Sequence, residues 1–205
     1  MDAILTTYFG NLRYGRSTSA GSLLLWTYLR KEITWHDDGY VAAGCSPDSA
    51  VPAVTLQSGV QFADLYPLAM SRGKIVMGGT CDSVGVGGCF SAGCYGPFTK
   101  LFGNAAVNII EAKVVVANGT LLTVSKNSHP DLFWSVRGGG GGVASVFTEF
   151  TVKTHRSPQY MTAAHFSGSA STTKDYQRLL ARVLQALGDL QANASLVSYA
   201  IVCSM

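Results

Sequence analysis

The feature that most constrains this sequence is a glycine-rich segment, GGTCDSVGVGGCFSAGCYG, which runs from Gly78 to Gly96. Glycine has no Cβ atom, so backbone N–H groups in such a loop can turn closely toward a flat ring or a diphosphate. A helix beginning near residues 83–86 would add its dipole to the same anion site. The spacing matches neither GxxxxGK[ST] nor GxGxxG after a strand. Nucleotide binding and a glycine-rich packing loop therefore both remain open at this point.

A second glycine run, Gly138 to Gly142, follows Arg137. Between the two runs, the dipeptide Asn118-Gly119 separates two strand-like segments, which predicts a hairpin with a tight two-residue turn. Hydrophobic spacing and turn residues predict the other elements. The predicted strands cover residues 22–28, 53–57, 74–77, 106–117, 120–125, 143–154, 161–166 and 196–202, and the predicted helices cover 61–72, 128–136 and 172–191.

Two helix ends carry recognisable signals. Ser128 is expected to cap the helix over 128–136, with Pro130 in its first turn, and Thr172 with Asp175 forms a capping box for the helix over 172–191. The order of elements predicts an α+β fold. The pattern of residues changes after Ser157, so residues 1–157 are expected to form one domain. Residues 158–205 are expected to form the start of a second domain, which is too short to close a sheet of its own.

Composition narrows the function classes. Charged residues make up 13% of the chain, against roughly 25% in a typical soluble domain, and mean hydropathy is +0.22. Part of the surface is therefore expected to be covered by a cofactor, a partner or further chain. A net charge of +3 is too small to indicate nucleic-acid binding. No membrane-spanning stretch and no signal peptide are predicted, which leaves the compartment undetermined.

The cysteines and histidines give no metal prediction. The five cysteines are an odd number, so no disulfide framework is expected, and no CxxC or histidine-rich partner supports a metal site. Cys89 and Cys94 are interpreted as small packing residues. Surface or packing roles are also expected for the four histidines, His36, His129, His155 and His165.

Three linked motifs decide between the interpretations of the glycine segment. GGTCDSVGVGGCFSAGCYG, FTKLFGNAAVNIIEAKVVVANG and PDLFWSVRGGGGG together resemble the FAD-binding domain of the vanillyl-alcohol oxidase and berberine bridge enzyme superfamily, the p-cresol methylhydroxylase type. GRSTSAGSLLLWTYLRKEITWHDD, AVTLQSGVQFADLY and FTEFTVKTH agree in the same order. The resemblance covers residues 10–157 and is closest to the FAD-linked oxidoreductases of fungal secondary metabolism. It implies a chain truncated at both ends, with only the beginning of an α+β substrate domain.

The resemblance also implies an FAD site. The first part of the loop would wrap the diphosphate and the flavin edge, the second part would continue the wrap, and the strand over 110–116 would lie along the nucleotide. The residues implied are Gly78, Gly79, Thr80, Cys81, Asp82, Ser83, Val84, Gly85, Gly88, Gly93, Tyr95, Gly96, Ile110 and Val116.

Cys81 stands where many members of that superfamily attach FAD through a thioether. A thiol in an amide-rich loop is expected to have a lowered pKa, which favours attachment; a small buried thiol is the other interpretation. The histidyl anchor of other members is absent, because Asn11 follows Gly10. The sequence also departs from the superfamily at Ala92 and Cys94, which are expected to crowd the loop, and at Ala144-Ser145.

The resemblance implies an FAD-dependent oxidoreductase that oxidises a small organic substrate by hydride transfer, with O₂ as acceptor, in secondary metabolism. Two alternatives stand beside it: a truncated, inactive remnant that binds FAD weakly or binds only a partner, and a nucleotide-binding module without flavin chemistry. The catalytic residues are not determined. Self-association through an uncovered apolar stripe on the helix over 172–191 is also expected.

Overall fold

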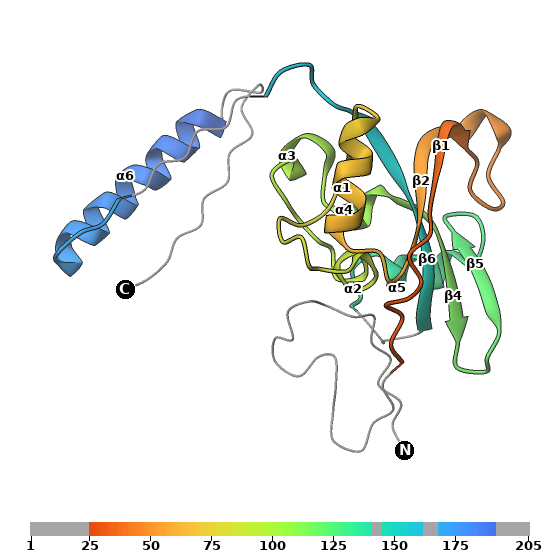
Figure 1. The fold of residues 1–205 in the computed structure, drawn as a ribbon. Coiled ribbons are helices and arrows are strands. Elements are labelled where there is room, and N and C mark those ends of the chain that lie inside the picture. The colour runs from red at the N-terminus through yellow and green to blue at the C-terminus, as the bar shows by residue number, and fades with distance from the viewer. Residues whose placement is uncertain (1–24, 141–144, 162–167, 192–205) are drawn as a thin grey trace. The chain divides into compact units, whose positions relative to one another are not determined.

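The structure is a computed structural model that describes residues 25–140, 145–161 and 168–191. The chain divides into two compact units, Met1–Ser157 and Pro158–Met205. The first unit is an antiparallel sheet with helices on one side: α1 (Phe62–Ser71), α2 (Val86–Ser91), α3 (Thr99–Phe102) and α4 (Ala105–Asn108) (Figure 1). The chain thus mixes sheet and helix, and the predicted α+β class is confirmed.

The sheet has the strand order β1-β2-β6-β4-β5, and β3 pairs with β6. The long strand β6 is central, since it pairs with β2, β4 and β3. The strands are β1 (Ile33–Tyr40), β2 (Val51–Gln57), β3 (Lys74–Val76), β4 (Ile109–Val116), β5 (Leu121–Ser125) and β6 (Ser145–Arg156).

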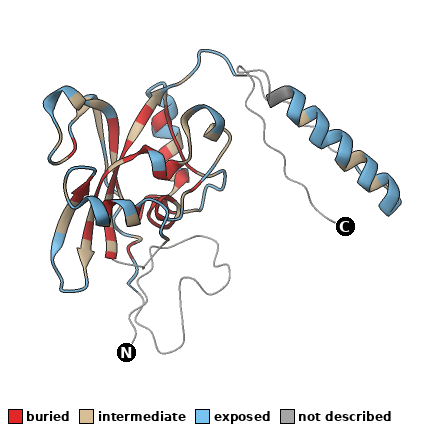
Figure 2. Ribbon diagram, turned by 180° about the vertical axis from the view of Figure 1, so that it is seen from behind, coloured by how far each residue is buried: buried red, intermediate tan, exposed pale blue. Residues whose placement is uncertain are grey.

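Side chains alternate across the sheet, because successive residues of a strand point to opposite faces. Phe150 pairs with Leu56 and Ala112, and all three are buried. Its neighbour Thr151 pairs with Thr55 and Glu111 on the opposite face. Figure 2 shows buried residues concentrated along the strands and the helices packed on them. The apolar face and the helices share one core, whose largest fully buried side chains include Leu56, Phe62, Leu65, Phe90 and Phe150.

Helix α1 (Phe62–Ser71) confirms the helix predicted over 61–72. Gln61 and Asp64 form a capping box at its start, and Pro67 is accommodated inside it. Gly73, at φ +62°, follows its end in the left-handed conformation that commonly terminates a helix. The short helices are the 3-10 turn η1 (Pro47–Ser49), α2 (Val86–Ser91), α3 (Thr99–Phe102), α4 (Ala105–Asn108) and α5 (Pro130–Val136).

The predicted hairpin is present, but two of its details were wrong. Residues 105–108 form α4, so β4 begins only at Ile109. The turn has three residues rather than two, because the Val116 N–H donates to the Thr120 carbonyl, with Gly119 at φ +84°. A glycine in the left-handed region at the third position is the usual requirement of a three-residue hairpin loop.

Other predictions near the ends of elements were also wrong. The described part of the predicted strand over 22–28 is turn and coil, while the strand β1 was not predicted. Ser128 does not cap α5; its hydroxyl donates to the Thr123 carbonyl, and His129 precedes the helix at φ +52°. The predicted strands over 161–166 and 196–202 lie almost wholly or wholly outside the described residues.

The described part of the second unit is mainly helix α6 (Thr173–Gln191). Thr172 caps it as predicted, since the Asp175 N–H donates to the Thr172 hydroxyl over 3.2 Å. Its apolar stripe is incompletely covered: Val183 and Leu184 are exposed, at 37% and 57%. The assignment of this unit to a substrate-binding domain stays a prediction. No helix in the described ranges is both long enough and apolar enough to span a bilayer.

Candidate functional site

The first glycine segment leaves the core and returns to it. The chain is buried from Ile75 to Gly78, exposed from Thr80 to Ser83, and buried again from Gly85, where α2 begins. Val86 N–H donates to the Val60 carbonyl over 2.8 Å, which closes the return. The residues between β3 and α2 therefore form a loop that is exposed at its centre, from Thr80 to Ser83, and buried at both ends.

The carbonyl groups of this loop are turned toward α1. The carbonyl oxygen of Asp82 accepts from Ala63 N–H over 2.9 Å, and that of Val84 accepts from Phe62 N–H over 3.1 Å. Gln61 Nε2 donates to the Ser83 carbonyl over 2.6 Å. Three successive loop carbonyls thus satisfy groups at the start of α1.

Several N–H groups of the same loop are not bonded to α1 in this way. Within the described ranges, the N–H groups of Thr80, Asp82 and Ser83 donate to no protein acceptor. Successive backbone N–H groups in an exposed turn form a concavity that binds anions such as phosphate. The loop therefore has the donor set that a diphosphate needs, and the residues present fit a dinucleotide cofactor.

Two of the glycines are required by packing. A Cβ atom on Gly78 would overlap the Phe62 ring and would lie 2.7 Å from Tyr66 Oη. A Cβ atom on Gly96 would overlap the Gly78 carbonyl oxygen. The packing interpretation is therefore correct for these two glycines. Nucleotide binding by the exposed residues between them stays a prediction.

Tyr66 of α1 holds the start of the loop, a role that was not predicted from the sequence. Its hydroxyl donates to the Gly79 carbonyl, and its ring stacks on Phe62 with centroids 5.0 Å apart. Burial, with a smaller contribution from Asp82, raises the pKa of Tyr66 far above its usual range. The phenol therefore stays a neutral donor, and it holds Gly79 in place.

Cys89 and Cys94 form a disulfide, so their interpretation as small packing residues was wrong. Their Cα atoms are 4.9 Å apart. Gly93, at φ +107°, and Cys94, at φ +48°, turn the chain back against α2, and this brings the two thiols together. Sequence spacing alone could not reveal that turn.

The two glycine runs meet. Gly140 N–H donates to the carbonyl of Ser91, the last residue of α2, over 3.0 Å. Arg137, just before the run, lies over the Phe133 ring with its Cζ 4.6 Å from the centroid, so it braces α5. Residues 141 and 142 lie outside the described part of the chain.

The remaining predicted site residues lie apart from one another. Tyr95 follows the disulfide and is 79% exposed. Ile110 and Val116 are half-buried at opposite ends of β4, about 20 Å apart in an extended strand. A single ligand that contacts both would have to run along the strand. These two assignments stay predictions.

Cys81 lies on the exposed part of the loop, so the interpretation as a small buried thiol was wrong. Its sulfur lies 3.5 Å from Ser83 Oγ. Cys45, the other described cysteine outside the disulfide, is half-buried and far from it in sequence. Cys81 is therefore the exposed thiol among the amides of the loop.

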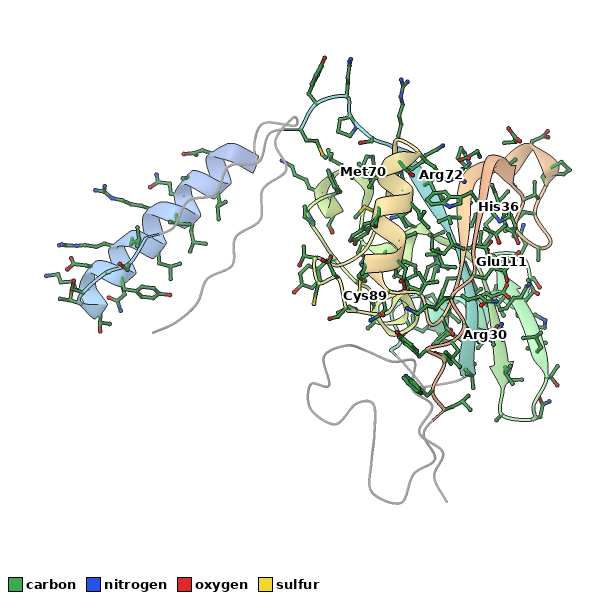
Figure 3. The ribbon with its side chains drawn as sticks, viewed as in Figure 1. Arg30, His36, Met70, Arg72, Cys89 and Glu111 are labelled. Atoms are coloured by element: carbon green, nitrogen blue, oxygen red, sulfur yellow. A yellow bond between two sulfur atoms is a disulfide. The ribbon has the colours of Figure 1, made fainter. Side chains whose placement is uncertain are left out.

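The other face of the sheet carries a polar network that the sequence did not predict. His36 Nε2 and Thr55 Oγ1 are 2.8 Å apart, and Thr55 and Thr151 Oγ1 are 2.9 Å apart. Glu111 accepts from the Tyr40 hydroxyl and from Ala43 N–H. These side chains line a shallow depression of about 290 Å³. Figure 3 shows Cys89 among the helices and His36 and Glu111 at the sheet.

Burial and the neighbouring Glu111 raise the pKa of Tyr40 to about 12. Each member of the network is paired with another protein group, so the network fixes β1 and the segment after it to the sheet. In the described ranges, no group of three or more His, Cys, Asp and Glu side chains is placed to hold a metal ion.

The chain is similar to known FAD-binding proteins. Residues 15–125 match the family described as FAD binding domain. An uncharacterized FAD-linked oxidoreductase of Arthroderma benhamiae is 34% identical over 193 residues, 94% of this chain and 34% of that protein. FAD-linked oxidoreductase ZEB1 of Gibberella zeae is 42% identical over 145 residues, 69% of this chain and 24% of that protein. The chain thus spans about a quarter to a third of these relatives.

Solved structures agree with the sequence comparisons. The VAO-type flavoprotein MtVAO615 of Myceliophthora thermophila is 34% identical, with a TM-score of 0.63 over 69% of this chain and 25% of its own. The 6-hydroxy-D-nicotine oxidase of Arthrobacter nicotinovorans is 28% identical, with a TM-score of 0.70 over 86% of this chain and 36% of its own.

Proposed function

Because the chain belongs to the FAD-binding-domain family of FAD-linked oxidoreductases, we propose that it holds FAD on the exposed loop between β3 and α2 and serves a flavin-dependent oxidoreductase. One observation supports the proposal that FAD binds to this loop. The N–H groups of Thr80, Asp82 and Ser83 have no protein acceptor within the described ranges, while neighbouring carbonyls of the loop accept hydrogen bonds from the start of α1. Preorganised amides of this kind bind phosphate oxygens.

The chain's own residues have distinct roles in this proposal. The loop amides bind the diphosphate, and Tyr66 and the tight packing of Gly78 keep the loop in one conformation. Bound FAD supplies a hydride acceptor. A fixed loop lowers the conformational entropy that cofactor binding would otherwise cost.

Cys81 supports a further part of the proposal, a covalent link to the flavin. Its exposed thiol stands on the same loop as the amides, whereas Cys89 and Cys94 are bonded to each other. Attachment through Cys81 would make the cofactor resistant to release by denaturation. Cys45 is the matched control, because it is also outside the disulfide but lies on a different segment, near Asn127.

The finer function is also a proposal: oxidation of a small organic substrate, with O₂ as acceptor, in secondary metabolism. Aurantioclavine synthase of Penicillium expansum, 39% identical over 141 residues, supports a role in biosynthesis. The inactive-remnant alternative predicts no flavin reduction by any substrate. Anaerobic bleaching of the flavin by a panel of benzylic alcohols, sugars and amines separates the two.

The cofactor is tested by mass spectrometry of the ligand released on denaturation. FAD is expected, and recovery of only FMN or a nicotinamide would contradict the proposal. The covalent link is tested by acid precipitation: a yellow pellet from the wild type and from Cys45→Ala, with a colourless pellet from Cys81→Ala, is the expected pattern. A yellow pellet from Cys81→Ala would assign the link to another residue.

Self-association through α6 is proposed on the exposure of Val183 and Leu184 within its apolar stripe. Exposed contiguous apolar surface commonly marks an interface. Sedimentation of the wild type should show a concentration-dependent dimer that Leu184→Gln weakens. An unchanged monomer at all concentrations would contradict it.

A further inference from the structure

We infer that the Cys89–Cys94 disulfide positions the cofactor loop, which is the loop between β3 and α2 on which FAD is proposed to bind. Reduction of the disulfide then weakens FAD binding without unfolding the domain. The inference rests on the proposed FAD site. It concerns a bond that joins the middle of α2 to the turn after it.

The bond lies directly against the start of the cofactor loop. A Cβ atom on Gly79 would lie 3.7 Å from the sulfur atoms of both Cys89 and Cys94. The carbonyl of Gly79 accepts from the Tyr66 hydroxyl. Gly79, which immediately precedes the exposed residues, is thus held between a phenol and a disulfide.

The bond also holds an unfavourable turn. Cys94 has φ +48°, a left-handed conformation that residues with a Cβ atom rarely adopt. Gly93, just before it, has φ +107°. The covalent link from Cys94 back to α2 keeps this turn closed, even though the backbone conformation at Cys94 is unfavourable.

Three other segments depend on the turn. The carbonyls of Gly93 and Cys94 accept from Ala106 N–H over 3.0 Å and from Ala105 N–H over 2.9 Å, which places the start of α4 on the turn. Gly96 packs against the carbonyl of Gly78. Ser91, between the two cysteines, receives the N–H of Gly140 from the second glycine run.

A small dithiol can reach the bond through Cys89, which is half-buried, whereas Cys94 is 9% exposed. The dithiol gives two electrons and two protons: its thiolate attacks one sulfur, the bond between Cys89 and Cys94 breaks, and two thiols form. The dithiol closes to its own disulfide. The turn then loses its covalent closure, while the buried core beneath it is unchanged.

The test uses Cys81→Ala, so that FAD exchanges freely, in oxidised form and after treatment with dithiothreitol. Alkylation and mass spectrometry should count two more thiols after reduction. The Kd for FAD should rise at least tenfold, while the far-ultraviolet circular dichroism at 25 °C stays the same. Removal of dithiothreitol and reoxidation should restore binding.

Two further variants separate positioning from a general loss of stability. Cys89→Ser with Cys94→Ser, in the same background, should bind FAD as weakly as the reduced protein and should not respond to dithiothreitol. Cys45→Ser should respond as its parent does, because Cys45 is outside the bond. Equal FAD affinity in the oxidised, reduced and double-serine proteins, or an unchanged thiol count, would overturn the inference.

Hydrogen exchange provides a readout that does not need FAD. Reduction should raise exchange at residues 79–85 and 93–106 and leave the strands β2 and β6 protected. If the oxidised protein binds no FAD, the proposed FAD site fails, while this exchange pattern still decides whether the bond positions the loop. Unchanged exchange in those segments would show that it does not.

Discussion

The two faces of the sheet are built from alternate residues of the same strands and are held by different interactions. Phe150 is buried between the sheet and the helices, whereas the next residue, Thr151, hydrogen-bonds to Thr55 on the other face. The apolar face carries the helices and the cofactor loop. The polar face carries a connected set of hydroxyl, imidazole and carboxylate groups, which joins β1 to the other strands.

The difference shows which interactions determine the path of the loop. On the apolar face, tight packing of rings against Gly78 leaves the loop only one path. On the polar face, hydrogen bonds among side chains join neighbouring strands, and these bonds do not involve the loop. Substitutions on the first face should therefore affect stability and FAD together, and substitutions on the second should affect stability alone.

Neighbouring positions in β6 give the largest expected contrast. Phe150→Ala should lower the free energy of unfolding by about 3–5 kcal/mol, since it leaves a cavity in the core. Thr151→Val should cost about 1 kcal/mol, since Thr55 keeps His36 as a partner. Urea unfolding followed by tryptophan fluorescence measures both. Equal costs would mean that the two faces do not differ as described.

Gly78→Ala should lower stability by about 1–3 kcal/mol, because the added methyl group has no room against Phe62 and Tyr66. FAD affinity should fall with it, because the cofactor loop begins there. Gly188→Ala is the matched control, since nothing lies within 4 Å of its Cβ position on α6. The control should leave FAD affinity unchanged; a loss as large as that of Gly78→Ala would remove the steric argument.

On the polar face, Tyr40→Phe should cost about 1.5–3 kcal/mol at neutral pH, because the buried carboxyl group of Glu111 loses a hydrogen-bond donor. Burial and Glu111 raise the pKa of Tyr40 from 10.0 to about 12. Between these values the unfolded state loses the proton that the folded state keeps, so stability falls as pH rises. The wild type should therefore lose stability faster than Tyr40→Phe from pH 10 to 12. Parallel profiles would contradict this environment for Tyr40, and FAD affinity at neutral pH should not change.

Asp64→Asn at the start of α1 should have the smallest effect, about 0.5–1 kcal/mol. Burial alone would raise the pKa of Asp64, but hydrogen bonds from Lys31 and Gln61 N–H outweigh it and lower that pKa below 3.8. This contribution is present above the unfolded value and is lost as pH falls through the folded one. Acid unfolding curves of the two proteins should converge at low pH, and a constant difference would contradict the ion pair.

The parts of the fold that the sequence predicted are those with a strong local signal. The repeat of apolar residues before Gly73 predicted α1, and Asn118-Gly119 predicted the hairpin. Strand β1 was missed because its sequence, ITWHDDGY, has polar residues at adjacent positions and bends within the pairing between His36 and Tyr40. Its place depends on partners far along the chain.

The candidate site also has parts that the sequence predicted and parts that it did not. The glycine segment was evident from the sequence, and its resemblance to FAD-binding domains is confirmed at the level of the family. The disulfide and the role of Tyr66 could not be predicted. Both depend on a turn and on helix packing that bring together residues whose sequence spacing carries no recognised pattern.

The exposed loop amides are expected to hold FAD. The direct measurement is residue-resolved amide hydrogen exchange with and without FAD, by nuclear magnetic resonance. FAD should slow exchange of the N–H groups of Thr80, Asp82 and Ser83 and leave exchange around Thr55 and Thr151 on the polar face unchanged. Protection that appears on the polar face, with none in the loop, would contradict it.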